Sequence, residues 1–196
     1  MEVIQPLDWV TKHQDNETGM HVLRMSHYVQ LLARQAGLSE WEAERVRQAA
    51  PMHDLGKIGI PDHILRKPGR LTEAEFAVIQ THCAMGHAIL GEQQAELLAL
   101  GALMALTHHE KWNGQGYPNQ LAGEAIPLAG RLAAIGDVFD ALTTVRSYKK
   151  AWSVDDALDL IAREAGEHFD PELATLFVSL KPALVAIMER YQEARE

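Results

Sequence analysis

The residues most capable of chemistry in this sequence begin with an adjacent histidine and aspartate, His53 and Asp54, followed by Lys57. Neighbouring side chains on a helix point about 100° apart, so the imidazole can bind one metal ion while the carboxylate bridges to a second. Lys57 is expected on the same side as Asp54, because residues at i and i+3 share a helix face. Its ammonium could then meet an anionic ligand beside the metals. The plainer interpretation is a polar surface pair at a helix end. Other residues along the chain have to decide between this interpretation and a metal-binding pair.

Further potential metal ligands are spread along the chain on predicted helices. Glu17 and His21 are at i and i+4, which places both on one side of a helix. The others are His82, His108, His109 and Asp137. Taken singly, each could be a solvated or core side chain, although a carboxylate among apolar neighbours needs a partner or a metal. A mixed set of histidines and carboxylates favours Mn, Fe or Zn over Mg, and the lack of cysteine ligands argues against a closed structural zinc site.

Length and composition describe one globular domain with, at most, a short extension. The chain has 196 residues, of which 47% are hydrophobic, enough for a sizeable core. Its formal net charge of −9 argues against binding long nucleic acid, which requires a basic surface. Cys83 is the only cysteine, which excludes an intramolecular disulfide, and no apolar run of about 18 residues indicates a membrane helix. We therefore expect a soluble, cytoplasmic protein.

Hydrophobic periodicity and helix-start signals predict an all-α fold that positions these side chains. Two pairs have the spacing of a capping box: Ser39 with Glu42 and Thr72 with Glu75. Pro51 interrupts a helix just before His53, so a kink is expected to set the His53-Asp54 pair off the regular helical line. The predicted helices run from about Asn16 to Gly37, Ser39 to Ala50, Thr72 to Leu90, Ala95 to His109 and Leu128 to Thr143, and further helices begin at Ser153, at Asp170 and after Pro182.

Residues 110–127 are predicted to form a long structured loop. They contain Gly114, Gly116, Pro118, Gly123 and Pro127. A loop of this length inside a compact domain is usually functional. No strand is expected in the chain beyond a short pairing within this loop.

Two longer segments carry a resemblance to a known family. The first runs His53-Asp54-Leu55-Gly56-Lys57-Ile58-Gly59-Ile60-Pro61-Asp62, and the second runs His108-His109-Glu110-Lys111-Trp112-Asn113-Gly114-Gln115-Gly116-Tyr117-Pro118. Both are similar to the signatures of the HD-GYP family, a branch of the HD metal-dependent phosphohydrolases. The resemblance extends from about Asn16 to about Leu176 and implies an all-α, multi-helix HD-type bundle with a long glycine-rich signature loop. The implied parts are a lead-in or linker over 1–15, the catalytic domain over 16–180 and an amphipathic C-terminal helix over 181–196.

The resemblance also implies a centre of two or three divalent transition metal ions. The implied ligands are His53, Asp54, His82, His108, His109 and Asp137, with Asp54 as a bridge. Family members with glutamate and histidine at the positions of Glu17 and His21 resemble the subset that holds three ions, so three are expected here. Iron or manganese is favoured, with zinc and nickel as alternatives. The remaining histidines match no ligand position of the family: His13, His27, His63, His87 and His168.

The activity implied by the resemblance is hydrolysis of cyclic di-GMP, a bacterial second messenger, to linear pGpG and in some members on to GMP. Water activated by the metal ions would attack phosphorus. The catalytic group would be His53, Asp54 and Lys57, with Lys57 stabilising the negative charge that builds up during attack.

Substrate contacts are implied for five residues: Lys57, Tyr117, Asp140, Arg146 and Lys149. Asp140 is expected to orient Arg146 through a charge-assisted hydrogen bond. A solvated basic turn is the plainer interpretation of Arg146 and Lys149. The sequence departs from the family pattern at Gln120, where glycine is usual, and a left-handed backbone there would be strained by a side chain.

Two other functions stay open from the sequence. One is an HD-type hydrolase of another nucleotide, such as a different cyclic dinucleotide. The other is a regulatory module that binds cyclic di-GMP without turnover. An upstream sensor or receiver domain, common in the family, is left open as a partner outside this chain, and so is a homodimer. Long nucleic acid and membrane are not expected as partners.

Overall fold

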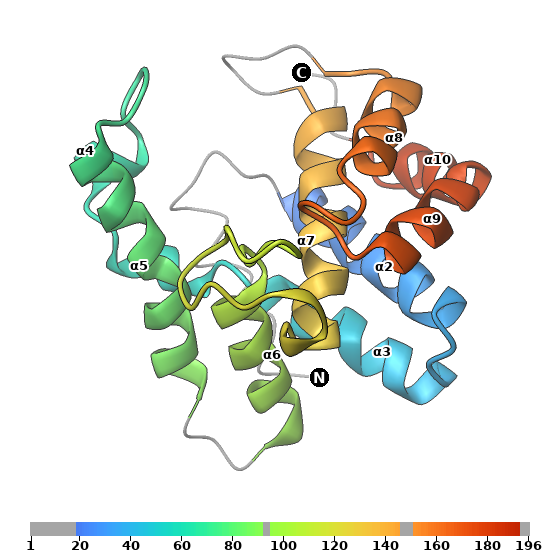
Figure 1. Cartoon of the computed structure of the whole chain (residues 1–196), viewed down its shortest axis with the longest axis horizontal. Coiled ribbons are helices and arrows are strands. Elements are labelled where there is room, and N and C mark those ends of the chain that lie inside the picture. The colour runs from blue at the N-terminus through green and yellow to red at the C-terminus, as the bar shows by residue number, and fades with distance from the viewer. Residues whose placement is uncertain (1–18, 92–94, 146–150, 193–196) are drawn as a thin grey trace.

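The computed structural model describes residues 19–91, 95–145 and 151–192 (Figure 1). Within these ranges the regular elements are all helical, and the β pairings are isolated bridges between Asn113 and Ala122 and between Ala165 and Phe169. The prediction of an all-α fold, with a short pairing in the glycine-rich loop, is confirmed. The elements in chain order are α2 (Gly19–Gln35), α3 (Glu40–Ala49), η1 (Ala50–Met52), η2 (Leu55–Gly59), α4 (Asp62–Leu65), α5 (Glu73–Leu90), α6 (Glu96–Thr107), η3 (Gly123–Ala125), α7 (Leu128–Thr143), α8 (Val154–Arg163), α9 (Pro171–Ser179) and α10 (Lys181–Arg190).

Helix α7 is central, with α5 and α6 to one side and α8 to α10 to the other (Figure 1), and it contacts α2, α6, α8 and α9. Leu132, Ile135 and Phe139 of α7 are fully buried, and burying such apolar surface is the main stabilising contribution to the core. Gly136 lets α2 approach closely, because a Cβ there would lie 2.7 Å from Val29 Cγ2. This close packing of α2 on α7 positions two elements of the site against each other.

The helix starts follow the signals in the sequence. Ser39 and Thr72 each accept a hydrogen bond from the backbone N–H of the glutamate three residues later, and that glutamate reaches back to the cap, so both predicted capping boxes are confirmed. Ser153 caps α8, and Asp170 caps α9 with Pro171 in the first helical position. Each such cap contributes about 1 kcal/mol to the stability of its helix.

The His53-Asp54 pair lies at a junction between two short 3₁₀ helices, η1 and η2. Pro51 falls within η1 and has no backbone N–H to donate, which favours the break. Asp54 has φ −103° and ψ 9°. The prediction that the proline sets the pair off the regular helical line is confirmed, and the simple angle between neighbours on an α-helix does not apply to it.

Gly56 lets the η2 segment lie directly against α5. A Cβ at this position would be 1.9 Å from the carbonyl oxygen of His82 and 2.5 Å from the backbone nitrogen of Gly86, so a larger residue cannot be accommodated. The contact brings Asp54 next to His82. Gly56 of the first signature is therefore required by the packing of η2 on α5.

The C-terminal helix α10 packs on α2, with Leu184 fully buried in the common core. The predicted lead-in over residues 1–15 lies outside the described residues. In the described part of the chain no single helix is long and apolar enough to cross a membrane; α9 and α10 pass a test of length and composition only as a pair, bent by 68°.

Candidate metal centre

Two groups of potential metal ligands lie next to each other in the described part of the chain. The four-residue group consists of Asp54, His82, His108 and His109, and the three-residue group consists of His21, His53 and Asp137. Within each group the donor atoms lie within 4.8 Å of one another. The donors come from α2, the η1–η2 junction, α5, the end of α6 and α7, so the fold assembles them from segments far apart in the sequence.

The Asp54 carboxylate lies between the two groups. Its Oδ2 is 3.1 Å from His53 Nε2, and its Oδ1 is 3.3 Å from His82 Nε2 and 3.6 Å from His108 Nε2. Each oxygen therefore faces a different group, which is the arrangement that a bridging carboxylate needs. In the three-residue group, His21 Nε2 is 3.7 Å from Asp137 Oδ1.

Hydrogen bonds fix which ring nitrogen of each histidine faces the centre. A carbonyl or an ionised carboxylate can only accept, so a ring nitrogen bonded to one carries the proton, and the other nitrogen offers its lone pair. Three Nδ1 atoms donate to backbone carbonyls: His53 to Ala50 at 2.7 Å, His82 to Ile79 at 2.6 Å, and His108 to Met104 and Ala105 at 3.1 Å each. The Nε2 atoms of these histidines are thereby left facing Asp54.

His21 is oriented differently, by a buried side-chain network. Its Nδ1 donates to Asp140 Oδ2 at 2.8 Å. Arg24 donates from Nε to Asp140 Oδ1 at 2.6 Å and from Nη2 to Asp140 Oδ2 at 2.9 Å, a bidentate pair. Thr144 Oγ1 donates to the same carboxylate, and Arg24 Nη1 also donates to the backbone carbonyl of Tyr191 at 3.0 Å. Asp140 is fully buried.

The charge states suit metal binding. Burial alone would raise the pKa of Asp54, but the neighbouring Lys57 and His53 hold that pKa well below its usual range. Burial lowers the pKa of His108 and holds the pKa of His109 well below its usual range. At neutral pH the centre therefore combines the ionised Asp54 carboxylate with the neutral imidazoles of His108 and His109.

One oxygen of the buried Asp54 carboxylate lacks a hydrogen-bond partner among the described residues. Asp54 is only 8% exposed, and its Oδ1 makes no hydrogen bond to any of the described residues. A buried carboxylate oxygen without such a partner is costly unless a cation compensates for it. The residues present thus fit a centre for divalent metal ions with nitrogen and oxygen ligands.

Lys57 and the signature loop border this centre. Lys57 Nζ lies 2.8 Å from Asp54 Oδ2, on the side expected from their spacing. Tyr117 stacks on the His109 ring, with the ring centroids 4.7 Å apart. Glu110 is 2% exposed and accepts hydrogen bonds from the backbone N–H groups of Asn119 and Leu121, which holds the loop in a fixed course.

Gln120 has a φ of 55°, so the residue that departs from the family pattern does stand in the left-handed region. A non-glycine residue there is strained. The hydrogen bonds that Glu110 makes on either side of Gln120 hold that conformation. The left-handed backbone that the family pattern indicated is therefore present at Gln120, and the loop keeps its course in spite of the side chain there.

The structure brings together most of the residues singled out from the sequence. Those in or beside the centre are His21, His53, Asp54, His82, His108, His109, Asp137, Lys57 and Tyr117. Glu17, Arg146 and Lys149 lie outside the described residues, so their roles stay predictions, as does a bond between Asp140 and Arg146. The described contacts of Asp140 are to His21, Arg24 and Thr144, and its contact with a substrate stays a prediction.

Sequence reasoning missed two charged residues, Arg24 and Glu110. Arg24 lies three residues after His21 and so shares its helix face, and that spacing was the available signal. Glu110 directly follows His108-His109 at the start of a glycine-rich loop. Both are nearly fully buried, which for a charged residue indicates a specific set of partners.

Comparison with known proteins gives consistent matches over nearly the whole chain. The profile described as "HD domain" matches residues 7–173. A Vibrio cholerae protein named cyclic di-GMP phosphodiesterase is 43% identical over 97% of this chain and 42% of its own length. A second V. cholerae protein, 3'3'-cGAMP-specific phosphodiesterase 2, is 42% identical over 95% of this chain and 36% of its own length. This chain thus spans less than half the length of either relative.

A solved structure shares the fold. The crystal structure of the cyclic GMP-AMP-specific phosphodiesterase V-cGAP3 of V. cholerae superimposes with a TM-score of 0.71 and 21% identity, covering 98% of this chain and 51% of that one. At that identity the likeness concerns the fold alone. The profile match over residues 7–173 and the two signature segments, with which this shared fold agrees, show that the chain belongs to the HD domain family, in its HD-GYP branch.

Proposed function

We propose that this chain is a metal-dependent phosphodiesterase that hydrolyses cyclic di-GMP to pGpG, with GMP as a further product. The observation that carries the proposal is the position of Asp54 between two groups of buried imidazole and carboxylate donors. Two closely spaced metal sites joined by a carboxylate are the usual arrangement for displacement at phosphorus. The relative named cyclic di-GMP phosphodiesterase, 43% identical over nearly all of this chain, supports the choice of substrate.

The four-residue group would hold one divalent ion and the three-residue group a second, with Asp54 shared between them. When bound, such ions supply Lewis acidity and lower the pKa of a bound water, which provides a nucleophile at neutral pH. Glu17, four residues before His21, would add an oxygen ligand to a third site. Iron or manganese is the proposed metal, as the family resemblance implies, and the mixed nitrogen and oxygen donors fit a divalent transition metal better than Mg.

Lys57 has a distinct role in this proposal. Its ammonium lies against Asp54, so it is placed at the border of the centre, where a phosphodiester would approach. A fixed positive charge at that point stabilises the negative charge that develops on the phosphoryl oxygens. Lys57 is a point charge with three donors and cannot itself replace a metal ligand.

Recognition is proposed to depend on local cations, because the chain carries a net charge of −9 and its substrate would be a dianion. Arg146 can direct two donors towards a phosphate or a guanine edge, and Lys149 adds a second charge. Tyr117, stacked on His109, would form the wall between the centre and the space next to it.

A second candidate function is hydrolysis of a mixed cyclic dinucleotide. The relative named as specific for 3'3'-cGAMP is 42% identical to this chain, nearly as similar as the cyclic di-GMP enzyme. Sequence similarity over the whole domain therefore does not separate the two substrates. A module that binds without turnover is the third candidate, and it is disfavoured because each donor position that the structure describes carries a competent ligand.

The test is turnover by protein reconstituted with Mn²⁺ or anaerobically with Fe²⁺, on cyclic di-GMP, 3'3'-cGAMP and cyclic di-AMP in parallel. We expect cyclic di-GMP to be cleaved fastest and Asp54→Ala to be inactive. His87→Ala is the matched control, since His87 is an exposed histidine on the same helix as His82 and belongs to neither group. Binding of cyclic di-GMP without cleavage by metal-loaded protein would support the non-catalytic module instead.

A further inference from the structure

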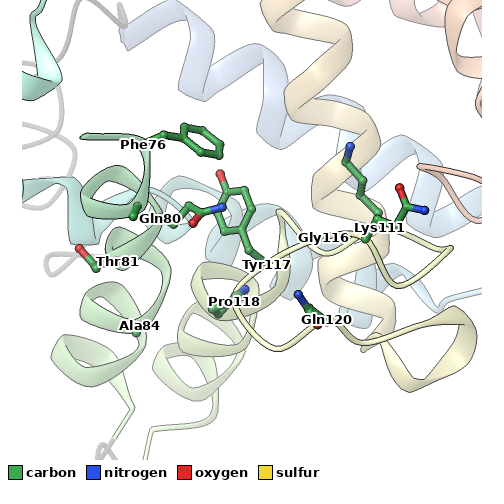
Figure 2. A pocket seen from close by; sticks show the side chains of 11 residues that line it. Phe76, Gln80, Thr81, Ala84, Lys111, Gly116, Tyr117, Pro118 and Gln120 are labelled. Carbon is green, nitrogen blue, oxygen red and sulfur yellow. The ribbon is translucent and has the colours of Figure 1, made fainter. Parts of the chain in front are cut away.

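A pocket of about 560 Å³ lies between α5 and the signature loop (Figure 2). One wall is a single face of α5, because Ala77, Gln80, Thr81 and Ala84 recur at three- and four-residue steps. The other wall is the loop segment Gly116–Pro118 with Gln120 and Lys111. The volume is within the range that holds small organic ligands.

The pocket begins where the metal centre ends. Tyr117 stacks on His109 at 4.7 Å with an interplanar angle of 28°, and it also lines the pocket. His82 lies on α5 between Thr81 of the pocket wall and Cys83 of the core. The pocket and the metal centre therefore meet at Tyr117, so a ligand with a phosphodiester at the metal centre would have its next group near this pocket.

Two aromatic rings supply flat apolar surface at the pocket. Phe76 meets Tyr117 in an edge-to-face contact with centroids 6.0 Å apart, and Figure 2 shows Gln80 beside the Tyr117 ring. Phe76 is 45% exposed, so its ring is accessible to a ligand in the pocket. Ala77 and Ala84 are small residues on the α5 wall and leave room in the pocket. Gly116 lets the loop pass close to Lys111, because a Cβ at Gly116 would be 2.3 Å from the backbone nitrogen of Lys111.

The polar groups of the pocket are mostly uncharged amides. Gln80, Gln115 and Gln120 each offer both a donor pair and an acceptor, and Lys111 adds one cation. Among the described residues that line the pocket none is acidic, which suits an anionic ligand. One lysine is too few for a phosphate site, whereas flat rings with amide edges suit a heterocyclic base, which stacks on its faces and bonds at its edge.

We propose that this pocket binds one purine base of the cyclic dinucleotide while the adjoining phosphodiester lies at the metal centre. The inference rests on the proposed function and deepens it. Phe76 and Tyr117 provide the stacking surface, and Gln80 contacts the edge of the base. Relatives named for cyclic di-GMP and for 3'3'-cGAMP are 43% and 42% identical to this chain, so overall identity does not separate the two substrates. The side chain placed to distinguish the base here is Gln80, which lies beside the Tyr117 ring in the pocket.

Phe76→Ala tests the stacking surface. Loss of a base-stacking ring is expected to raise KM for cyclic di-GMP, and the Kd for the linear product pGpG by calorimetry, about 5- to 150-fold. Metal content should stay at the wild-type level, because Phe76 belongs to neither group of metal donors. Phe76→Trp should restore most of the affinity. Trp41→Ala is the control, an aromatic residue 63% exposed on α3.

Gln80→Ala tests base recognition. It should change the ratio of kcat/KM for cyclic di-GMP to that for 3'3'-cGAMP by roughly 2- to 10-fold, the value of one hydrogen bond. Wild-type affinity for pGpG in Phe76→Ala, in a protein that hydrolyses cyclic di-GMP, would overturn the base pocket and leave the proposed function standing. A wild-type protein that cleaves no cyclic dinucleotide would overturn the proposed function itself.

Discussion

The two groups of metal donors are supported in different ways. In the four-residue group, His82 and His108 donate their Nδ1 protons to backbone carbonyls of their own helices. In the three-residue group, His21 donates instead to the side chain of Asp140, which Arg24 holds in turn. A backbone carbonyl is present whatever the residue, whereas a carboxylate can be lost by a single substitution. The orientations of His82 and His108 are therefore built into their helices, and that of His53 is likewise set by a backbone carbonyl, whereas that of His21 depends on a few side chains.

Removing Asp54 should affect both groups of metal donors alike, because Asp54 lies between them. We expect Asp54→Ala to lose turnover of cyclic di-GMP entirely and to lose metal from both groups, since a shared ligand supports both ions. Elemental analysis and activity assays on the purified variant measure both effects. Full activity with unchanged metal content would contradict the assignment of Asp54 as a bridge.

Removing Asp140 should instead affect one group only. In Asp140→Ala, His21 loses the partner that sets its tautomer, so metal affinity of the three-residue group should fall about 10- to 100-fold while the four-residue group keeps its ion. Arg24 would also be left buried without its carboxylate, which should lower the free energy of unfolding by about 3–5 kcal/mol. Metal titration and urea unfolding of the metal-free protein measure these effects separately.

The control for Asp140→Ala is Arg131→Met. Arg131 makes an ion pair of similar length, 2.6 Å, with Asp170, the residue that caps α9, and it belongs to neither group of donors. Arg131→Met should reduce stability without changing metal affinity. Equal losses of metal affinity in both variants would mean that Asp140 acts through the general stability of the fold.

Glu17→Ala tests whether a third metal ion is bound beside the three-residue group. If Glu17 completes a third site beside His21, the variant should bind about one ion fewer per chain and keep its helical circular dichroism spectrum. Glu17 is four residues from His21, which belongs to the three-residue group, so the ion of the four-residue group should stay. The same stoichiometry in both proteins would show that Glu17 is a solvated helix residue.

The smallest effect concerns pH. Burial would raise the pKa of Asp140, but hydrogen bonds from His21 and Arg24 hold it below its usual value. A depressed pKa in the folded state contributes stability that is fully present above the unfolded pKa, about 3.9, and is lost as the pH falls through the folded value. Metal-free wild type should therefore lose more stability than Asp140→Asn between pH 5 and the lowest pH at which both remain folded. Chemical unfolding at a series of pH values measures the difference, and parallel curves would remove Asp140 from the acid response.

Much of the fold was predictable because its signals are local. The capping boxes at Ser39 and Thr72 and the break at Pro51 each depend on residues within a few positions of one another. The left-handed backbone at Gln120 was expected instead from the family pattern, in which glycine is usual there. The candidate donors could be named because the two signature segments resemble the HD-GYP family, whereas each donor taken singly had a plainer interpretation.

The residues that support the donors could not be predicted in the same way. Arg24 is paired with Asp140, 116 positions away, and only the packing of α2 on α7 makes them neighbours. Sequence proximity favoured Arg146 as the partner of Asp140. Glu110 was missed because a buried glutamate inside a loop has no periodic pattern, and its role depends on the path of the backbone around it.

The hydrogen bond from Arg24 to the carbonyl of Tyr191 has a thermodynamic consequence. It connects the end of α10 to Asp140, and through Asp140 to His21, so the docking of that end and the orientation of a metal ligand share one set of contacts. Coupling of this kind is reciprocal: an ion that fixes His21 also favours the docked end of α10, and a displaced end weakens the hold on the ion by the same free energy. Metal occupancy and the protection of the Tyr191 region from hydrogen exchange should therefore rise and fall together.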